Sequence, residues 1–157
     1  MGLIYYRKAT ISDAQILKDI AKRVISTNYT SFLGIEVTTD FIESGMSDKE
    51  IDDGLTNCVL MIVNGQITGF VITNGDVLHL IMIDVPMQNA GYGSALLAHI
   101  EEELFSQFNK IQLQTFQENV HTVQFYLKNG WRITGQEIAP ELDKIMLQFE
   151  KTQNACE

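Results

Sequence analysis

The sequence predicts one α/β (α+β) domain built on a mixed, mostly antiparallel central sheet of about seven strands, flanked by about four helices. Three observations lead to this prediction. Short apolar runs alternate along the chain with longer runs of helical periodicity. Two Asn-Gly pairs, the strongest short signal for a hairpin, join three of the apolar runs into a meander. The length of 157 residues suits one domain with its own core, spanning residues 1–151 and followed by a short frayed tail at residues 152–157.

The first third of the chain predicts one strand followed by helices. Residues 3–7 form a short apolar run that suits the first strand. Ser12 and Gln15 have the spacing of a capping box, the reciprocal pairing that opens many helices, and an amphipathic run follows them. Ser47 and Glu50 repeat this spacing, so a second helix is expected to begin there.

The middle of the chain predicts a meander of three strands, at residues 58–63, 66–73 and 77–85. Asn64-Gly65 and Asn74-Gly75 separate these runs, and each pair readily adopts the backbone angles of a tight two-residue turn. The three strands are therefore expected to pair antiparallel in chain order.

The last part of the chain alternates helices and strands before ending in a pair of strands. The expected elements are a helix at 95–108, a strand at 111–116, a helix at 121–128, and strands at 131–137 and 144–150. Asn119 precedes the second of these helices as its cap, and Asn129-Gly130 ends it.

Composition excludes several classes of protein. A hydrophobic content of 45% with 20% charged residues is typical of a globular chain. No apolar run approaches the roughly 20 residues of a membrane helix, and residues 1–8 lack the apolar core of a signal peptide, so we expect a cytoplasmic protein without a membrane partner. The net charge of −9 argues against a nucleic-acid partner. It favours a cationic substrate such as an amine, although solubility alone also explains it.

The cysteines predict neither a disulfide framework nor a zinc site. Cys58 and Cys156 are the only two, and they lie far apart in the sequence. Reduced thiols and the absence of a metal are therefore expected.

The stretch from Gln88 to Ser94 is the most informative part of the sequence. It lies between an apolar strand-like run and an amphipathic helix-like run, and it contains Gly91 and Gly93. Glycines allow a tight turn and close approach of a ligand. The helix that follows presents free N–H groups and the positive end of its dipole. Together these features predict an anion site, and phosphate is the usual anion.

Two common phosphate-binding patterns fit this loop poorly. The ATP and GTP loop needs Lys followed by Ser or Thr after its last Gly, whereas Gly93 is followed by Ser94 and Ala95. The dinucleotide fingerprint needs a small residue three positions after the second Gly, where this chain has Leu96.

A third pattern fits, and a second block downstream supports it. Gln88, Gly91 and Gly93 match Gln/Arg-x-x-Gly-x-Gly/Ala after a strand. The second block reads Asn119-x-x-Thr122-x-x-Phe125-Tyr126-x-Lys128-x-Gly130-Trp131. In their order and spacing the two blocks resemble those of the GNAT superfamily of acyl-CoA N-acyltransferases. Thr122 stands where that family usually has Ala, and Trp131 where it usually has Phe.

The resemblance implies a GNAT-like fold over nearly the whole chain and direct transfer of an acetyl group from acetyl-CoA to an amine, without a metal. A homodimer is the family's common state. The resemblance also implies a set of cofactor-binding residues: Ile83, Asp84, Val85, Gln88, Asn89, Ala90, Gly91, Tyr92, Gly93, Ser94, Asn119, Tyr126 and Lys128. Ala90 stands where the family often has Lys or Arg, so one charge contact is missing. Lys128 can reach the ribose phosphate instead, although an ordinary surface lysine also explains this position.

The same resemblance suggests which side chains carry the chemistry. Tyr126 matches the tyrosine that protonates the leaving thiolate, although a core aromatic residue would fit the same position. His79 is the best candidate for the base that deprotonates the amine, because its ordinary pKa suits neutral pH; a structural histidine is the alternative. Asn28 and Tyr29 are expected to line the acceptor site together with Phe32.

The sequence leaves two other functions open. The domain could bind acyl-CoA as a sensor without turnover, or it could use a longer acyl donor. The identity of the acceptor, a small molecule or a peptide amine, is not encoded in any recognisable motif.

Overall fold

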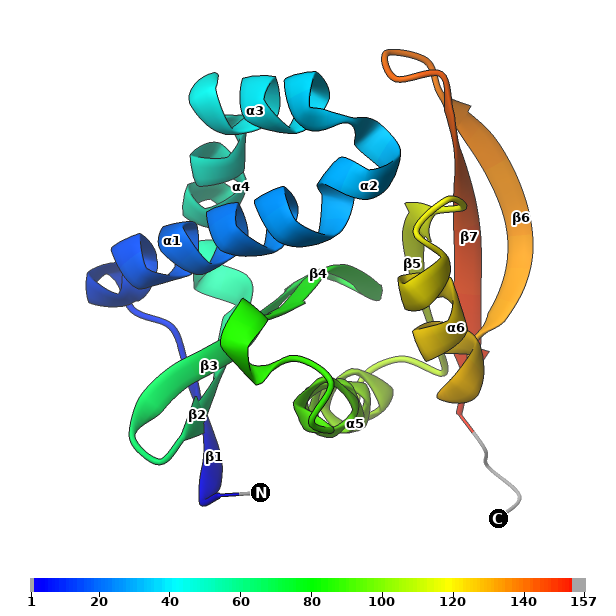
Figure 1. Cartoon of the computed structure of the whole chain (residues 1–157). Helices are drawn as coiled ribbons and strands as arrows, with labels where there is room; N and C mark the ends of the chain where they lie inside the picture. Colours follow the sequence, from blue (N-terminus) through cyan, green and yellow to red (C-terminus); the bar gives the residue numbers. More distant parts are fainter. Residues whose placement is uncertain (1, 154–157) are drawn as a thin grey trace.

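A computed structural model describes residues 2–153, and it confirms the predicted sheet. Seven strands pair in the order β1-β2-β3-β4-β5-β7-β6 (Figure 1). Among the described strands, β4 and β5 form a parallel pair. The other five pairs of adjacent strands are antiparallel. The strands are β1 (Ile4–Lys8), β2 (Cys58–Val63), β3 (Gln66–Asn74), β4 (Val77–Ile83), β5 (Lys110–Phe116), β6 (Arg132–Ala139) and β7 (Lys144–Thr152).

The described part of the chain contains more helix than the sequence predicted. The helices are α1 (Ala14–Val24), α2 (Thr30–Leu33), α3 (Ile35–Glu43), α4 (Met46–Gly54), α5 (Tyr92–Phe105) and α6 (Val120–Lys128). A π-helical turn, Ile25–Tyr29, carries the chain from α1 into α2. Residues 25–33 contain neither Gly nor Pro, so nothing in the backbone chemistry interrupts the helix before Gly34. Within residues 2–153, every helix is too short or too polar to span a bilayer.

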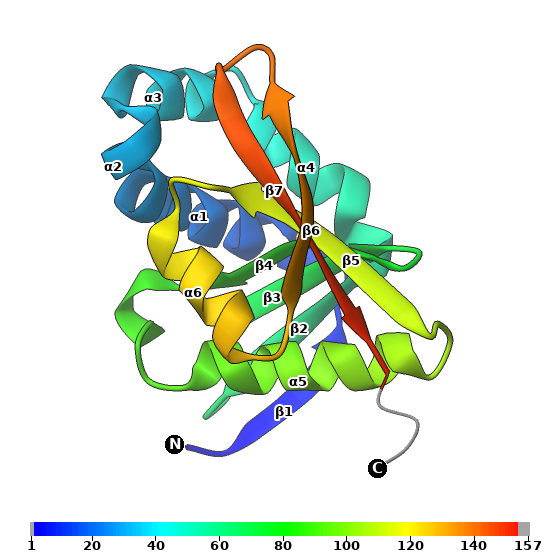
Figure 2. The ribbon, with the colours of Figure 1, turned by 90° about the vertical axis from the view of Figure 1, so that its right-hand side faces the viewer.

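Helices α1 and α4 lie on one face of the sheet, and α5 and α6 lie on the other (Figures 1 and 2). A hydrophobic core lies on each side. One core lies under α1 and α4 and contains Leu17, Ile51 and Phe70, all fully buried. The other lies under α5 and α6 and includes Leu96 and Phe149. Each helix therefore stabilises the sheet through one apolar face.

The sheet is split between β4 and β5, and this split positions the site. The two strands pair at a single position, Val77 with Gln112, near the start of both. Beyond that point they diverge, and Figure 1 shows β5, β6, β7 and α6 standing apart from the first half. The end of β4 consequently has a free edge inside the molecule, where backbone groups are not used by a neighbouring strand.

The two hairpins expected from Asn-Gly pairs both form. Asn64 and Gly65 adopt φ angles of 50° and 82°, which are the left-handed values that a type I′ turn requires. In the second hairpin the two linking residues are Gly75 and Asp76, one position later than predicted, since Asn74 already pairs with Val77. The meander is confirmed, with its second turn displaced by one residue.

Both predicted capping boxes are wrong. The chain enters α1 through a short turn at Ile11–Asp13, and the Asp13 carboxylate accepts the Thr10 N–H at 2.7 Å. The reciprocal pair is thus Thr10 with Asp13 and not Ser12 with Gln15. In α4 the cap is Gly45, and Ser47 lies buried within the first turn. Serine at the right spacing was a weak signal because a neighbouring residue could cap equally well.

Replacing Asp13 with Asn is expected to lower the free energy of unfolding by about 1–3 kcal/mol at pH 7. The Arg7 guanidinium donates two hydrogen bonds of 2.9 Å to this buried carboxylate and holds the pKa of Asp13 well below its usual value of 3.8, despite burial. A lowered pKa stabilises the fold above the unfolded-state pKa, and this stabilisation is lost as the pH falls below about 4. Urea unfolding at pH 7 and at pH 3 should therefore show the difference between wild type and variant shrinking in acid. An equal difference at both pH values would contradict this account.

The one cysteine in the described residues is buried and inert. Cys58 is 2% exposed in the core under α1 and α4, and burial raises the pKa of its thiol to about 12. At neutral pH it stays protonated and is a poor nucleophile. Of the predicted tail at residues 152–157, Thr152 is the last residue of β7 and the Gln153 N–H donates to the Asn109 carbonyl at 2.9 Å. Cys156 and the rest of residues 154–157 lie outside the described residues.

Candidate functional site

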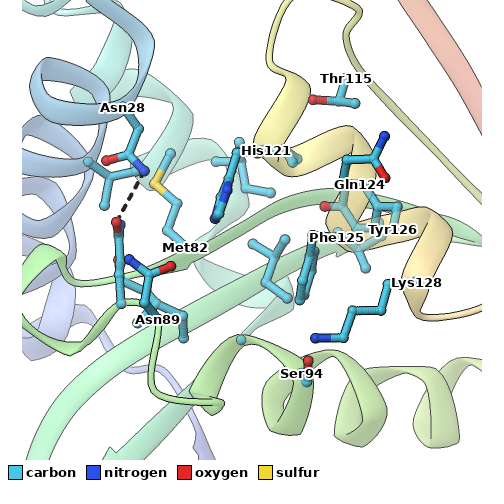
Figure 3. Close-up of a pocket in the computed structure, with 18 of the residues that line it drawn as sticks. Asn28, Met82, Asn89, Ser94, Thr115, His121, Gln124, Phe125, Tyr126 and Lys128 are labelled. Atoms are coloured by element: carbon cyan, nitrogen blue, oxygen red, sulfur yellow. Dashed lines mark hydrogen bonds between the residues drawn. The ribbon is translucent and has the colours of Figure 1, made fainter.

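A cavity of about 550 Å³ lies in the split between β4 and β5. It is also bounded by the start of α5, by α6 and by the end of α1 (Figure 3). Many residues predicted for the site line it: Asn28, Tyr29, His79, Ile83, Gln88, Asn89, Gly91, Gly93, Ser94, Tyr126 and Lys128. The structure thus brings together segments that are far apart in the sequence.

The glycine loop ends in a helix that begins earlier than predicted. Helix α5 starts at Tyr92, not at residue 95, because Gly91 adopts a φ of 89° and serves as its N-cap. Gly93 and Ser94 therefore lie in the first turn of the helix. The N–H groups of residues 92–94 donate to no acceptor within residues 2–153. Unpaired amides at a helix N-terminus beside a cavity form an anion site.

The side chain of Gln88 links the loop to both neighbouring segments. Its Nε2 donates to the carbonyl oxygen of Ile83 at 2.9 Å, at the end of β4. Its Oε1 accepts a hydrogen bond of 3.1 Å from Nδ2 of Asn28, drawn as a dashed line in Figure 3. The first bond fixes the orientation of the Gln88 amide, and the second then fixes Asn28. Gln88 therefore holds the π-helical turn against the end of the strand.

Tyr126 on α6 is almost completely buried, with 4% of its surface exposed. Its ring packs against Trp131 and Phe149. Burial, with a smaller contribution from Tyr29, raises the pKa of the Tyr126 hydroxyl well above its ordinary value of 10. The hydroxyl therefore stays protonated at neutral pH and can donate a hydrogen bond or a proton. Tyr126 therefore belongs both to the hydrophobic core under α5 and α6 and to the wall of the cavity.

His79 lies at a bulge in β4. Ile72 of β3 pairs with Leu80, but Thr73 pairs with Leu78, so His79 is the extra residue. Bulges change the direction of a side chain and are frequent beside active sites. The ring lies toward α4, where its Nε2 is 2.6 Å from Oε2 of Glu50. His79 is thus held by a carboxylate while it lines the cavity.

Some predicted cofactor residues do not line the cavity. The carboxylate of Asp84 receives two hydrogen bonds of 2.9 Å from Arg23 of α1 and caps the Val85 N–H. Val85 packs against the core under α1 and α4, and the Tyr92 ring is buried in the opposite core. These side chains, like that of Ala90, are absent from the cavity wall. The Arg23–Asp84 pair instead attaches α1 to the chain just after β4.

A second, smaller cavity of about 370 Å³ adjoins the first. Asn119 lines this one, together with Phe32 of α2. Asn119 precedes α6 as predicted, but its side chain makes no capping hydrogen bond. Asn28 and Gln88 line both cavities, so they stand at the boundary between the two.

Several cavity residues were not predicted from the sequence. His121 is directed into the cavity from the first turn of α6 (Figure 3), and Gln114 and Thr115 face it from β5. Phe125 lies inside the second motif, so the motif itself could have suggested it. The sequence indicated Glu50 only as part of a capping box, and its contact with His79 gave no signal because the two residues lie 29 positions apart.

Charged groups at the cavity are few. Lys128 is the only Lys or Arg among the residues that line it, and Figure 3 shows its side chain reaching from α6 toward Ser94. A positive charge beside the amides of α5 strengthens an anion site. Within residues 2–153, no three His, Cys, Asp or Glu side chains are gathered in a way that could hold a metal ion.

Comparisons with known proteins agree with this geometry. The model of the acetyltransferase (GNAT) domain matches residues 11–141. The uncharacterized protein YxbD of Bacillus subtilis is 28% identical over 116 residues, which are 62% of this chain and 73% of YxbD. The PaiA N-acetyltransferase from Thermoplasma acidophilum, solved in complex with coenzyme A, superimposes with a TM-score of 0.80 at 18% identity, over 96% of this chain and 99% of that one. A GCN5-related N-acetyltransferase from Rhodopseudomonas palustris gives a TM-score of 0.84 at 12% identity, over 98% of both chains. At these identities the two structures establish the shared fold.

Proposed function

Because the chain belongs to the acetyltransferase (GNAT) family, we propose that it transfers an acetyl group from acetyl-CoA directly to a primary amine. One observation carries the proposal: the unpaired N–H groups of residues 92–94 open onto a cavity at the split in the sheet. The coenzyme A complex of the PaiA protein, which has the same fold, supports the choice of ligand.

In this proposal the chain binds the cofactor at three places. The amides of Tyr92, Gly93 and Ser94 hold the diphosphate, with Lys128 supplying the positive charge that Ala90 does not. The free edge of β4 near Ile83 offers backbone groups to the amides of the pantetheine arm. Bound acetyl-CoA supplies an activated thioester, and one N–H of that edge stabilises the oxyanion formed from its carbonyl.

Two side chains then move protons. His79 accepts a proton from the ammonium group of the acceptor, which frees the nitrogen lone pair to attack the thioester carbonyl. When the tetrahedral intermediate collapses, the carbon–sulfur bond breaks and Tyr126 donates its hydroxyl proton to the leaving thiolate. The nitrogen of the new amide gives up its second proton, and this proton restores the Tyr126 hydroxyl. Burial keeps the Tyr126 hydroxyl protonated at neutral pH, so the proton is in place before the thiolate leaves.

The π-helical turn and α2 form the proposed wall for the acceptor. Asn28 and Tyr29 lie on this turn, and π-helical turns are frequent at functional sites. Phe32 contributes an apolar ring, which lies 5.5 Å from the ring of Phe116 across the split. A small-molecule or peptide amine fits this mixture of amide and aromatic groups.

Two measurements test the proposal in sequence. Coenzyme A present at 100 times its dissociation constant should stabilise the protein by about 2.7 kcal/mol, seen as a rise in melting temperature. Acetyl-CoA with a panel of primary amines should then release free thiol only when a suitable amine is present. Stabilisation by coenzyme A without amine-dependent thiol release would favour a sensor. Thiol release only with longer acyl-CoA donors would show that acetyl-CoA is not the donor. No stabilisation at millimolar coenzyme A would overturn the proposal.

A further inference from the structure

The acidic residues of α4 are paired, and one pair differs from the others. Asp48 and Asp52 bind lysines of α1, and Asp53 binds Lys49 of its own helix. Glu50 instead contacts His79, with 2.6 Å between Oε2 and Nε2. Two of these lysine pairs attach α4 to α1 and the third lies within α4, so the contact of Glu50 with a cavity residue needs a different explanation.

The bulge in β4 makes this contact possible. Leu78 belongs to the core under α5, whereas Leu80 packs against the core under α1 and α4. The extra residue at position 79 allows two successive side chains to face α4, and the histidine is brought to Glu50. A bulge costs strand pairing, so its position beside the cavity suggests a functional reason.

The hydrogen bond also selects the form of the imidazole ring. In the neutral ring, a proton on Nε2 is donated to the Glu50 carboxylate, which leaves the lone pair on Nδ1. A carboxylate in this position both orients the ring and balances the charge that appears when Nδ1 takes a proton. About half of the His79 side chain is exposed, so the proton can leave to water after each turnover.

We propose that Glu50 is the positioning residue for His79, and that the pair forms the proton acceptor for the incoming amine. The inference rests on the proposed acetyl transfer. In the step itself, an N–H bond of the ammonium breaks, an N–H bond forms at Nδ1, and the freed lone pair attacks the thioester carbon. Glu50 keeps its contact with Nε2 throughout and touches neither substrate.

Other titratable groups near His79 do not replace this pair. Those that line the same cavity are Tyr29, His121, Tyr126 and Lys128. None of them bonds to His79 in the described part of the chain, and the facing residues of β5, Gln114 and Thr115, are neutral. Glu50 is therefore the one ionisable group in hydrogen-bond contact with the ring there.

The test compares two acceptors of different basicity. The fastest alkylamine of the panel is protonated at pH 7, whereas an alkoxyamine of the same length is already neutral and needs no base. His79→Gln should lower kcat about 100-fold with the alkylamine and much less with the alkoxyamine. The alkylamine loss should also shrink as the pH approaches the pKa of the amine itself. Glu50→Gln should lower kcat about 10-fold with the alkylamine, and Glu50→Asp should retain part of the rate.

Further comparisons separate positioning from general damage. The double variant should be no slower than His79→Gln alone, because both changes disable one unit. Asp53→Asn, which removes another acid of α4, should leave the rate unchanged. An equal loss of kcat with the alkylamine and the alkoxyamine would overturn the inference while leaving acetyl transfer intact. So would a double variant whose loss of kcat equals the product of the two single losses. Absence of amine-dependent turnover in the wild type would overturn the proposed function and this inference with it.

Discussion

Replacing Tyr126 with Phe is expected to lower kcat about 100- to 1000-fold and to leave the KM values for acetyl-CoA and amine nearly unchanged. The hydroxyl acts only when the thiolate leaves, so its loss affects the transition state and not the binding of either substrate. The ring itself remains, and its contacts with Trp131 and Phe149 remain with it. Steady-state kinetics followed through thiol release measure the effect.

Tyr6→Phe is the matched control for this experiment. Tyr6 also packs against the core under α5, and its hydroxyl makes a long hydrogen bond of 3.4 Å to the Ala95 carbonyl. Its loss should change kcat less than twofold. A Tyr126→Phe enzyme within threefold of wild type would show that thiolate protonation does not depend on this hydroxyl.

Replacing Gly93 with Leu is expected to weaken coenzyme A binding at least 100-fold, which corresponds to about 2.7 kcal/mol. A Cβ placed at this position meets the Phe125 ring at 3.5 Å and Ile83 Cγ1 at 3.9 Å, so the side chain enters the cavity. Further atoms of leucine would occupy the space between the start of α5 and α6. Calorimetry with coenzyme A measures the loss directly.

Gly93→Ala separates this steric block from any backbone effect. The single methyl group of alanine makes only ordinary van der Waals contacts. Alanine also has a higher helix propensity than glycine. The alanine variant should therefore bind coenzyme A within a few-fold of wild type and melt at a slightly higher temperature. Equal affinity in the leucine variant would place the cofactor outside this cavity.

The fold was predictable where local chemistry decides the structure. Asn64-Gly65 needs left-handed backbone angles that few other pairs accept, so the first hairpin could be placed exactly where it occurs. Capping was less predictable, because Thr10 and Gly45 lay close to the serines and formed the caps instead. The sequence predicts the start of α5 three residues late, because Gly91 is both part of the loop and the cap of the helix.

The site was predictable to the extent that its residues lie within the two motifs. Gln88 and Tyr126 could be named because the two blocks that contain them resemble those of the GNAT family. The Glu50–His79 contact could not be predicted, because it depends on the bulge in β4 and on the packing of α4 against the sheet. The partner of Asp84 was hidden for the same reason: Arg23 is separated from it by 61 positions and meets it only in the folded chain. Long-range pairs of this kind leave no periodic trace in the sequence.

The split in the sheet has a consequence for solubility. An unpaired strand edge on a protein surface can recruit strands of other molecules and lead to aggregation. Here the free edge of β4 lies inside the molecule, facing β5 and α6, and the rings of Phe32 and Phe116 approach each other across the opening. The protein can therefore keep a strand edge that no other strand pairs with available for a ligand, without exposing this edge to other molecules.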